Sequence, residues 1–136
     1  MDILDADLQE RSGISLRWYD VLVHLEEAPD ERLRMSELAR RIVASTSGLT
    51  RVIDGMERAG LVRRERPASD RRAIEVVPTP RGMEVLASAR PLHREAIERH
   101  FARHLDGREV KALTRSLTKV RDHVRPLREE QVTGSS

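Results

Sequence analysis

The fold of this 136-residue chain is decided by residues 45–81, STSGLTRVIDGMERAGLVRRERPASDRRAIEVVPTPR. The beginning of this stretch predicts a short amphipathic helix, because apolar residues recur at positions i, i+3, i+4 and i+7 and would form one stripe. Ser45 is the expected N-cap, and Gly60 is the expected C′ residue, since glycine adopts the left-handed conformation without steric cost. The apolar stripe consists of Leu49, Val52, Ile53 and Met56.

The polar face of this predicted helix carries short hydroxyl side chains and an arginine. Short side chains let a helix approach a DNA groove closely, and arginine can reach guanine or phosphate. A plain solvated surface is the alternative interpretation when the helix is considered alone. The residues on this face are Thr46, Ser47, Thr50, Arg51 and Asp54.

The segments on either side of this helix predict a second helix upstream and a β-hairpin downstream. A second short helix is predicted upstream over residues 35–43, with Ser36 as its cap. Two short helices joined by a few small residues form the helix-turn-helix pattern. Downstream, residues 61–66 and 73–77 are predicted strands, separated by a turn at residues 67–70. A helix-turn-helix followed by such a hairpin is a winged helix.

Positive charge is concentrated in this region, although the formal net charge of the chain is only +2. Phosphate neutralisation supplies much of a DNA-binding protein's affinity, and an arginine at a hairpin tip can enter a narrow minor groove. Asp70 is interpreted either as the partner of a neighbouring guanidinium or as an ordinary turn residue. The arginines are Arg51, Arg58, Arg63, Arg64, Arg66, Arg71, Arg72 and Arg81.

The joint pattern resembles the MarR-type winged-helix regulators over roughly residues 14–125. The matching segments are residues 33–39, 47–54, 57–64, 69–72 and 79–82. The resemblance implies a bacterial, cytoplasmic and nucleoid-associated transcription factor that binds a palindromic operator in double-stranded DNA as a homodimer. It also implies that the regulator is a repressor, released from DNA by a small-molecule effector.

By the same resemblance, the residues that contact DNA lie at the start of the second helix and at the tip of the wing. Arg72 matches the wing arginine of the family's Asp-x-Arg pattern, and Asp70 matches its aspartate. The expected set of DNA-binding residues is Ser36, Ser45, Thr46, Ser47, Gly48, Thr50, Arg51, Arg64, Asp70, Arg71 and Arg72.

The expected fold class is mainly α, a three-helix core plus a β-hairpin wing, with N- and C-terminal dimerisation helices. Residues 15–79 would form the DNA-binding lobe, with a helix from Ser15 to about Glu27 and a short third strand at residues 33–35. The dimerisation helices would occupy residues 1–14 and 80–130, followed by a disordered tail at 131–136. The first of these helices is shorter than is usual in the family, so either the start is assigned late or the helix is short.

Two long C-terminal helices are predicted. The first would begin at Thr79-Pro80, an N-cap followed by proline, and run to about Leu105, with Pro91 kinking or splitting it. The second has the capping residues Asp106 and Glu109. Its apolar residues alternate at spacings of three and four, which is the seam of a coiled coil and requires a partner helix from the same chain, a second subunit, or both. The seam consists of Val110, Leu113, Leu117, Val120, Val124 and Leu127.

A ligand site is the least defined part of the sequence. The family resemblance implies that small aromatic acids or other phenolic compounds bind between the dimerisation helices and the DNA-binding lobe. The candidate residues are Arg17, Trp18, Tyr19 and His24, where Trp18 could stack on a ring and Arg17 could pair with a carboxylate. The alternative is that Trp18 and Tyr19 are core or interface residues.

Histidines offer an alternative kind of sensor. His93, His100 and His104 are spaced i, i+7 and i+11, and the last two have the i, i+4 spacing of two zinc ligands on one helix. His24 or Glu98 could complete such a set. Histidine pairs are also common on partly exposed helices. No metal and no cofactor are therefore expected, and zinc sensing through His100 and His104 is the alternative.

Composition excludes several other classes. The chain has no cysteine, which excludes disulfides, thiolate zinc sites and cysteine redox sensing. Aromatic residues make up only 2%, so no platform for stacking single-stranded bases is expected. No apolar run exceeds three residues, so no membrane span is expected. No catalytic constellation is visible and no enzyme is expected. A winged helix used for protein contacts is the remaining alternative, although it would not need a basic wing.

Overall fold

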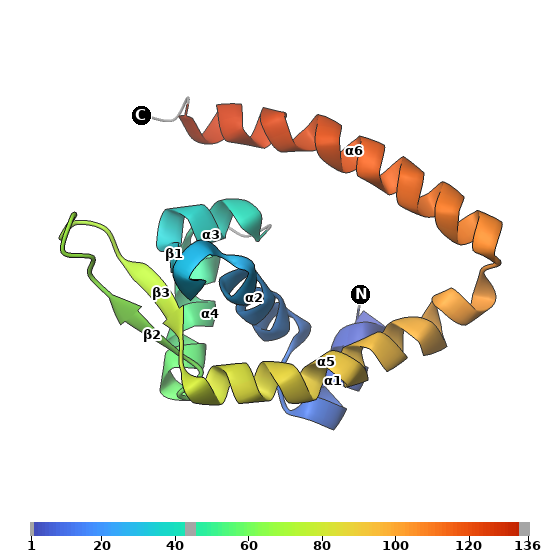
Figure 1. Ribbon diagram of the computed structural model, residues 1–136, viewed down its shortest axis with the longest axis horizontal. Coiled ribbons are helices and arrows are strands. Elements are labelled where there is room, and N and C mark those ends of the chain that lie inside the picture. Colours follow the sequence, from blue (N-terminus) through green and yellow to red (C-terminus); the bar gives the residue numbers. More distant parts are fainter. Residues whose placement is uncertain (1, 43–45, 134–136) are drawn as a thin grey trace. The chain divides into compact units, whose positions relative to one another are not determined.

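The computed structural model describes the backbone of residues 2–42 and 46–133, and the side chains of residues 3–42 and 47–124. The chain divides into two compact units, residues 1–96 and 97–136. The prediction of a mainly helical winged helix-turn-helix is confirmed, since most elements are helices and the strands form one small antiparallel sheet (Figure 1). No described helix is both long enough and apolar enough to cross a membrane.

The first unit contains the helices and strands of the winged helix, and its hairpin of β2 and β3 extends away from the helices (Figure 1). In chain order the elements are α1 (Asp2–Ser12), α2 (Leu16–Glu27), the 3-10 helix η1 (Pro29–Glu31), β1 (Leu33–Arg34), α3 (Met35–Arg41), α4 (Thr46–Arg58), β2 (Val62–Glu65), β3 (Glu75–Pro78) and α5 (Pro80–His100), which crosses into the second unit.

The N-terminal segment forms a short helix that is part of the first unit's core. Leu4 and Leu8 of α1 are buried. The Asp5 carboxylate accepts a hydrogen bond from the backbone N–H of Leu16 at 2.7 Å, which satisfies one of the unpaired donors at the start of α2. The predicted cap of α2 is confirmed, because the Ser15 hydroxyl accepts from a backbone N–H in the first turn.

Helix α3 begins and ends differently from the sequence prediction. The predicted cap at Ser36 is wrong, because the helix begins at Met35 and Arg34 occupies the N-cap position. Arg34 is the last residue of β1, and the N–H of Met35 donates to the carbonyl of Ile74, which directly precedes the paired strand β3. The chain therefore passes from strand to helix without a capping turn. Helix α3 ends at Arg41, and the predicted cap of α4 at Ser45 lies outside the described residues.

Helix α4 ends as its glycine predicts. Gly60 has a φ of +74° and donates to the Glu57 carbonyl, while the N–H of Leu61 donates to the Met56 carbonyl at 2.9 Å. These two bonds form a Schellman motif, and Met56 and Leu61 are both buried. The predicted apolar stripe of α4 is also confirmed, since Leu49 and Ile53 are buried with Met56.

The sheet has the strand order β1-β3-β2 with antiparallel pairing. The predicted third strand is present, because Leu33 of β1 pairs with Val76 of β3. In the hairpin, Arg64 lies opposite Val76 and Glu65 lies opposite Glu75. Since side chains alternate between the faces of a strand, Arg64 and Glu65 project to opposite faces of the hairpin.

The start of α5 lies against the end of α4. The Thr79 hydroxyl accepts from the N–H of Gly82 at 3.0 Å and donates to the Gly60 carbonyl at 2.6 Å, so the predicted cap is confirmed. The Thr79 N–H donates to the carbonyl of Leu61. A Cβ added to Gly82 would lie 2.1 Å from that same carbonyl oxygen. Glycine is therefore required for this close approach of helix to backbone.

Helices α2 and α5 pack together through polar and aromatic side chains. The rings of Tyr19 and His93 are 4.5 Å apart and inclined at 43°. Nδ1 of His93 is buried and has no hydrogen-bond partner among the described residues. Burial lowers the pKa of His93 below its usual 6.5, and the charge of Asp20 opposes this shift. Arg90 of α5 pairs with Glu26 of α2, and this carboxylate raises the pKa of Arg90.

The C-terminal helices differ in length from the prediction. Helix α5 contains Pro91 without being divided by it, but it ends at His100 rather than near Leu105. A 3-10 helix, η2 (Ala102–His104), follows before α6 (Gly107–Thr133). The predicted capping of α6 is confirmed, because the Asp106 carboxylate accepts from two backbone N–H groups of the first turn. Helix α6 includes residues 131–133 of the expected tail, and residues 134–136 lie outside the described part.

The second unit exposes its apolar residues. No side chain described between residues 97 and 124 is buried. The predicted seam of α6 lies on this exposed surface, where Leu117 is 59% exposed, and the side chain of Leu127 is outside the described residues. The other exposed seam residues are Val110, Leu113, Val120 and Val124.

We expect Gly82→Ala to destabilise the first unit, because the new methyl group would overlap the backbone carbonyl of Leu61. Forcing an extra methyl group into a packed site costs about 1–3 kcal/mol. Urea unfolding followed by circular dichroism would measure this loss. Gly107→Ala is the matched control, since a Cβ there has no heavy atom within 4 Å. Equal stability of Gly82→Ala and the wild type would contradict the packing.

We expect the half-buried His93 to make folding stability depend on pH. Because its folded pKa is lowered, the unfolded chain takes up the proton first as the pH falls below 6.5. The contribution of His93 is therefore complete above that pH and declines as the pH falls toward the lowered pKa. His93→Leu should flatten the dependence of unfolding free energy on pH between about 7.5 and 5.5, whereas exposed His123→Gln should not. If the unfolding free energy of His93→Leu and that of His123→Gln depended on pH identically, His93 would not be the source of the pH dependence.

Candidate nucleic-acid interface

Helix α4 presents its polar residues to solvent. Ser47, Thr50 and Arg51 are exposed, and Gly48 is half-buried. The opposite side of the helix is buried in the core, so the helix is fixed with this polar face outward. Of the other predicted DNA-binding residues of the helix-turn-helix, Ser36 is exposed in the first turn of α3. Ser45 and the side chain of Thr46 lie outside the described residues.

The wing tip exposes two arginines and shapes its turn with an aspartate. Arg71 and Arg72 are exposed. The Asp70 carboxylate accepts from the backbone N–H of Arg72 at 3.1 Å, and its other oxygen lies 3.6 Å from the Arg34 guanidinium. The interpretation of Asp70 as a turn residue is therefore confirmed, whereas the expected bidentate pair with a neighbouring arginine is replaced by a single contact with Arg34. The guanidinium that it pairs with belongs to β1, however, rather than to a wing arginine, which the sequence did not indicate.

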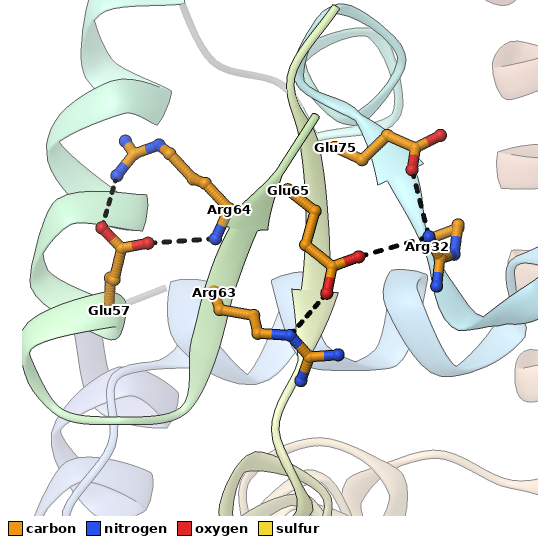
Figure 2. Close-up of polar contacts among 6 residues, drawn as sticks. All are labelled: Arg32, Glu57, Arg63, Arg64, Glu65 and Glu75. Carbon is orange, nitrogen blue, oxygen red and sulfur yellow. Dashed lines mark hydrogen bonds and ion pairs between the residues drawn. The ribbon is translucent and has the colours of Figure 1, made fainter. Parts of the chain in front are cut away.

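Arg64 does not extend into solvent like the arginines of the wing tip. One nitrogen of its guanidinium lies 2.7 Å from Asp54 Oδ1, and another lies 3.1 Å from Glu57 Oε1. The backbone N–H of Arg64 donates to the second oxygen of Glu57 at 3.0 Å. The Arg64 side chain is 23% exposed, against 49% for neighbouring Arg63. Figure 2 shows Arg64 turned toward Glu57 and away from the contacts of Arg63.

The other face of the hairpin carries a second charged cluster (Figure 2). Glu65 and Glu75 are paired across the strands, and two carboxylates in this arrangement repel each other. Arg32 lies 3.3 Å from both, and Arg63 lies 2.7 Å from Glu65. The hydrogen bond from Arg63 lowers the pKa of Glu65, with the charge of Arg32 acting in the same direction and burial opposing it. Sequence reasoning missed this cluster, although the hairpin register would have placed the two glutamates together.

The candidate ligand residues of α2 face different neighbours. Trp18 lies against α4, where its ring is 3.2 Å from a Cβ built on Gly55. Tyr19 lies against His93 of α5, and both Trp18 and Tyr19 pack on the core. Arg17 is exposed. His24 lies 3.6 Å from Asp20 of its own helix. The two aromatic residues therefore contribute to packing, Trp18 against α4 and Tyr19 against α5.

The histidines proposed as an alternative metal site are separated by the end of α5. His100 is the last residue of that helix, and His104 lies in η2, so the expected i, i+4 arrangement on one helix is wrong. Phe101 between them has φ −129° and ψ −64°, which ends the regular helix. Within the part of the chain that the structure describes, no cluster of three histidine, aspartate or glutamate residues could hold a metal ion.

Comparisons with known proteins agree with this architecture. The family model described as MarR family matches residues 12–73. The HTH-type transcriptional repressor YetL of Bacillus subtilis is 33% identical over 81 residues, which are 60% of this chain. The chain spans 48% of the length of that curated relative.

Two solved structures from Streptomyces coelicolor are similar over most of the chain. The MarR family transcriptional regulator AbsC is 37% identical with a TM-score of 0.82, and the match covers 90% of this chain and 82% of AbsC. Sco3205, a MarR family transcriptional regulator solved in complex with DNA, is 34% identical with a TM-score of 0.84, and the match covers 90% of this chain and 80% of Sco3205. The fold and these relatives are those of transcriptional regulators rather than enzymes. The chain belongs to the MarR family of transcriptional regulators.

Proposed function

We propose that this chain binds double-stranded DNA in a sequence-specific manner and regulates transcription. The observation that carries the proposal is the joint exposure of the polar face of α4 and of Arg71 and Arg72 at the wing tip. A helix of this kind fits the major groove, and exposed arginines on a hairpin suit the minor groove. The DNA-bound state of Sco3205 supports the same use of the fold.

The DNA contacts that we propose fall into two groups. The first group lies on the helix-turn-helix and determines which bases are contacted, and the second lies on the wing and contributes mainly charge. The proposed residues are Ser36, Ser45, Thr46, Ser47, Gly48, Thr50 and Arg51 in the first group, and Arg71 and Arg72 in the second. Asp70 supports the wing through its hydrogen bond to the backbone of Arg72.

The functional form that we propose is a homodimer on a palindromic operator. Its support is the row of exposed apolar residues on α6, which a second copy of the chain would cover. A two-fold axis relates the two α4 helices, and such helices contact half-sites about 34 Å apart, one turn of DNA.

The regulator acts as a repressor in this proposal and is released from DNA by a small aromatic effector in the cytoplasm. The repressor role is supported by the name of the B. subtilis relative. The packing of α2 against α5 at Tyr19 and His93 would couple a ligand near these residues to the DNA-binding elements, since α2 also contacts α4 through Trp18.

We expect operator binding to depend on salt through the wing arginines. Arg72→Ala should weaken binding to duplex DNA from the region upstream of the chain's own gene, and should flatten the slope of log K against log salt by about one. Mobility shifts over a salt series measure both quantities. Lys119→Ala in α6 removes the same charge away from the seam and should leave the slope unchanged. Failure of the wild type to bind at low salt would reject DNA binding and favour a protein-interaction module.

We expect the α6 seam to be required for dimerisation. Leu117→Glu places a charge on an exposed apolar position of the second unit, so it should leave the first unit folded but should oppose association. Light scattering after gel filtration should give the dimer mass for the wild type and half that mass for the variant. Lys119→Ala is again the control. A wild-type monomer, or an unaltered dimer in Leu117→Glu, would contradict this arrangement.

A further inference from the structure

We infer that Arg64 is a positioning residue, which sets the orientation of the wing relative to α4 rather than contacting phosphate itself. This inference rests on the proposed DNA binding. It concerns the residue that sequence reasoning counted among the DNA contacts and that the structure pairs with two carboxylates of α4.

The contacts of Arg64 link the exposed face of α4 to the base of the hairpin. Asp54 and Glu57 are one helical turn apart, and the planar guanidinium donates to both, with distances of 2.7 and 3.1 Å. A third hydrogen bond joins the backbone N–H of Arg64 to Glu57. The backbone of β2 is thereby fixed to α4 together with the side chain, so a rotation of the hairpin would break three bonds at once.

This link lies beside the residues proposed to contact DNA. Arg64 Nη2 lies 3.5 Å from the carbonyl oxygen of Thr50, and Asp54 follows Arg51 by three positions on the exposed side of α4. The hairpin continues from β2 into the loop that carries Arg72. Because the loop is remote from the link, a small change of angle at Arg64 moves the wing tip by a larger distance, out of reach of the groove.

The opposite face of the hairpin is tied to a different part of the unit. Arg32, which precedes β1, bridges Glu65 and Glu75 across the two strands. This contact holds the hairpin strands to each other and to β1, but it does not reach α4. Among the described side chains of β2 and β3, Arg64 therefore provides the ion pairs to α4. These ion pairs fix the angle between the hairpin and α4, and that angle decides whether the helix and the wing can reach their grooves together.

Simple electrostatics and the positioning role predict opposite effects for the same variant. Asp54 and Glu57 repel the phosphates of approaching DNA, so their removal should strengthen binding if they act only through charge. If they hold Arg64 and the wing, their removal should weaken binding. Whether DNA affinity rises or falls therefore identifies the role of the two carboxylates, whatever the size of the change in affinity.

The first experiment compares Asp54→Ala/Glu57→Ala with wild type for binding to the upstream duplex, at a temperature where circular dichroism shows both to be folded. Alanine maintains the helix, so the variant removes the carboxylates and little else. We expect affinity to fall about tenfold, a size typical for coupled residues. Glu37→Ala is the control, because Glu37 pairs with Arg41 inside α3 and its loss should not weaken binding. Tighter binding by the double variant would overturn the inference.

The second experiment is a double-mutant cycle with the wing tip. Arg64→Ala should reduce affinity about tenfold in the wild type but less than about twofold when Arg71 and Arg72 are both already alanine, because both wing contacts have then been lost. Arg64→Lys should resemble Arg64→Ala, since a lysine cannot bridge two carboxylates in the same geometry. Additive losses, or full activity of Arg64→Lys, would mean that Arg64 contacts phosphate directly and would overturn the inference.

These outcomes separate the inference from the proposed function. A wild-type chain that does not bind the duplex at low salt overturns DNA binding and the positioning role together. A wild-type chain that binds, with a tighter Asp54→Ala/Glu57→Ala variant or with additive losses in the cycle, overturns the positioning role alone.

Discussion

The backbone of Leu61 is the point on which the arrangement of the winged helix depends. Its N–H closes α4, and its carbonyl accepts from Thr79 and lies against Gly82 at the start of α5. One peptide group therefore fixes where α4 ends and where the long helix α5 begins. Gly60 makes this possible, because its left-handed conformation turns the chain directly from helix into strand. The wing and α5 diverge from this junction, so their directions are determined together.

Local signals in the sequence predicted most elements well, and the errors arose where a distant contact or an unsignalled helix end decides the structure. The apolar stripe of α4, the cap at Ser15 and the turn at Gly60 depend on neighbouring residues only, and all three are present. The cap at Ser36 failed because a strand pairing with residues near Ile74 decides where α3 begins. The histidine spacing failed because α5 ends at His100, and the sequence carries no glycine or proline there to indicate it.

Much of the candidate DNA-binding surface could likewise be predicted, but the roles of its arginines could not. Sequence reasoning treated each arginine as a positive charge available to phosphate. In the structure, Arg64 and Arg32 are each shared between two carboxylates, and Arg34 lies near Asp70. These pairs join residues up to 43 positions apart, so periodicity and composition contain no information about them. The basic character of the wing is therefore confined to its tip, while its base is electrically balanced.

In the proposed homodimer, the exposed apolar face of α6 would make the folding of the two units depend on chain concentration in different ways. The first unit buries its leucines within one chain, so dilution does not alter its folding. The second has no buried side chain among those described between residues 97 and 124, so its apolar residues gain no burial within one chain. If a second copy covers this face, as in the proposed homodimer, α6 becomes more stable by mass action as the chain becomes more abundant. In that homodimer, the number of copies in a cell would act on the folding of α6 as well as on the occupancy of DNA targets.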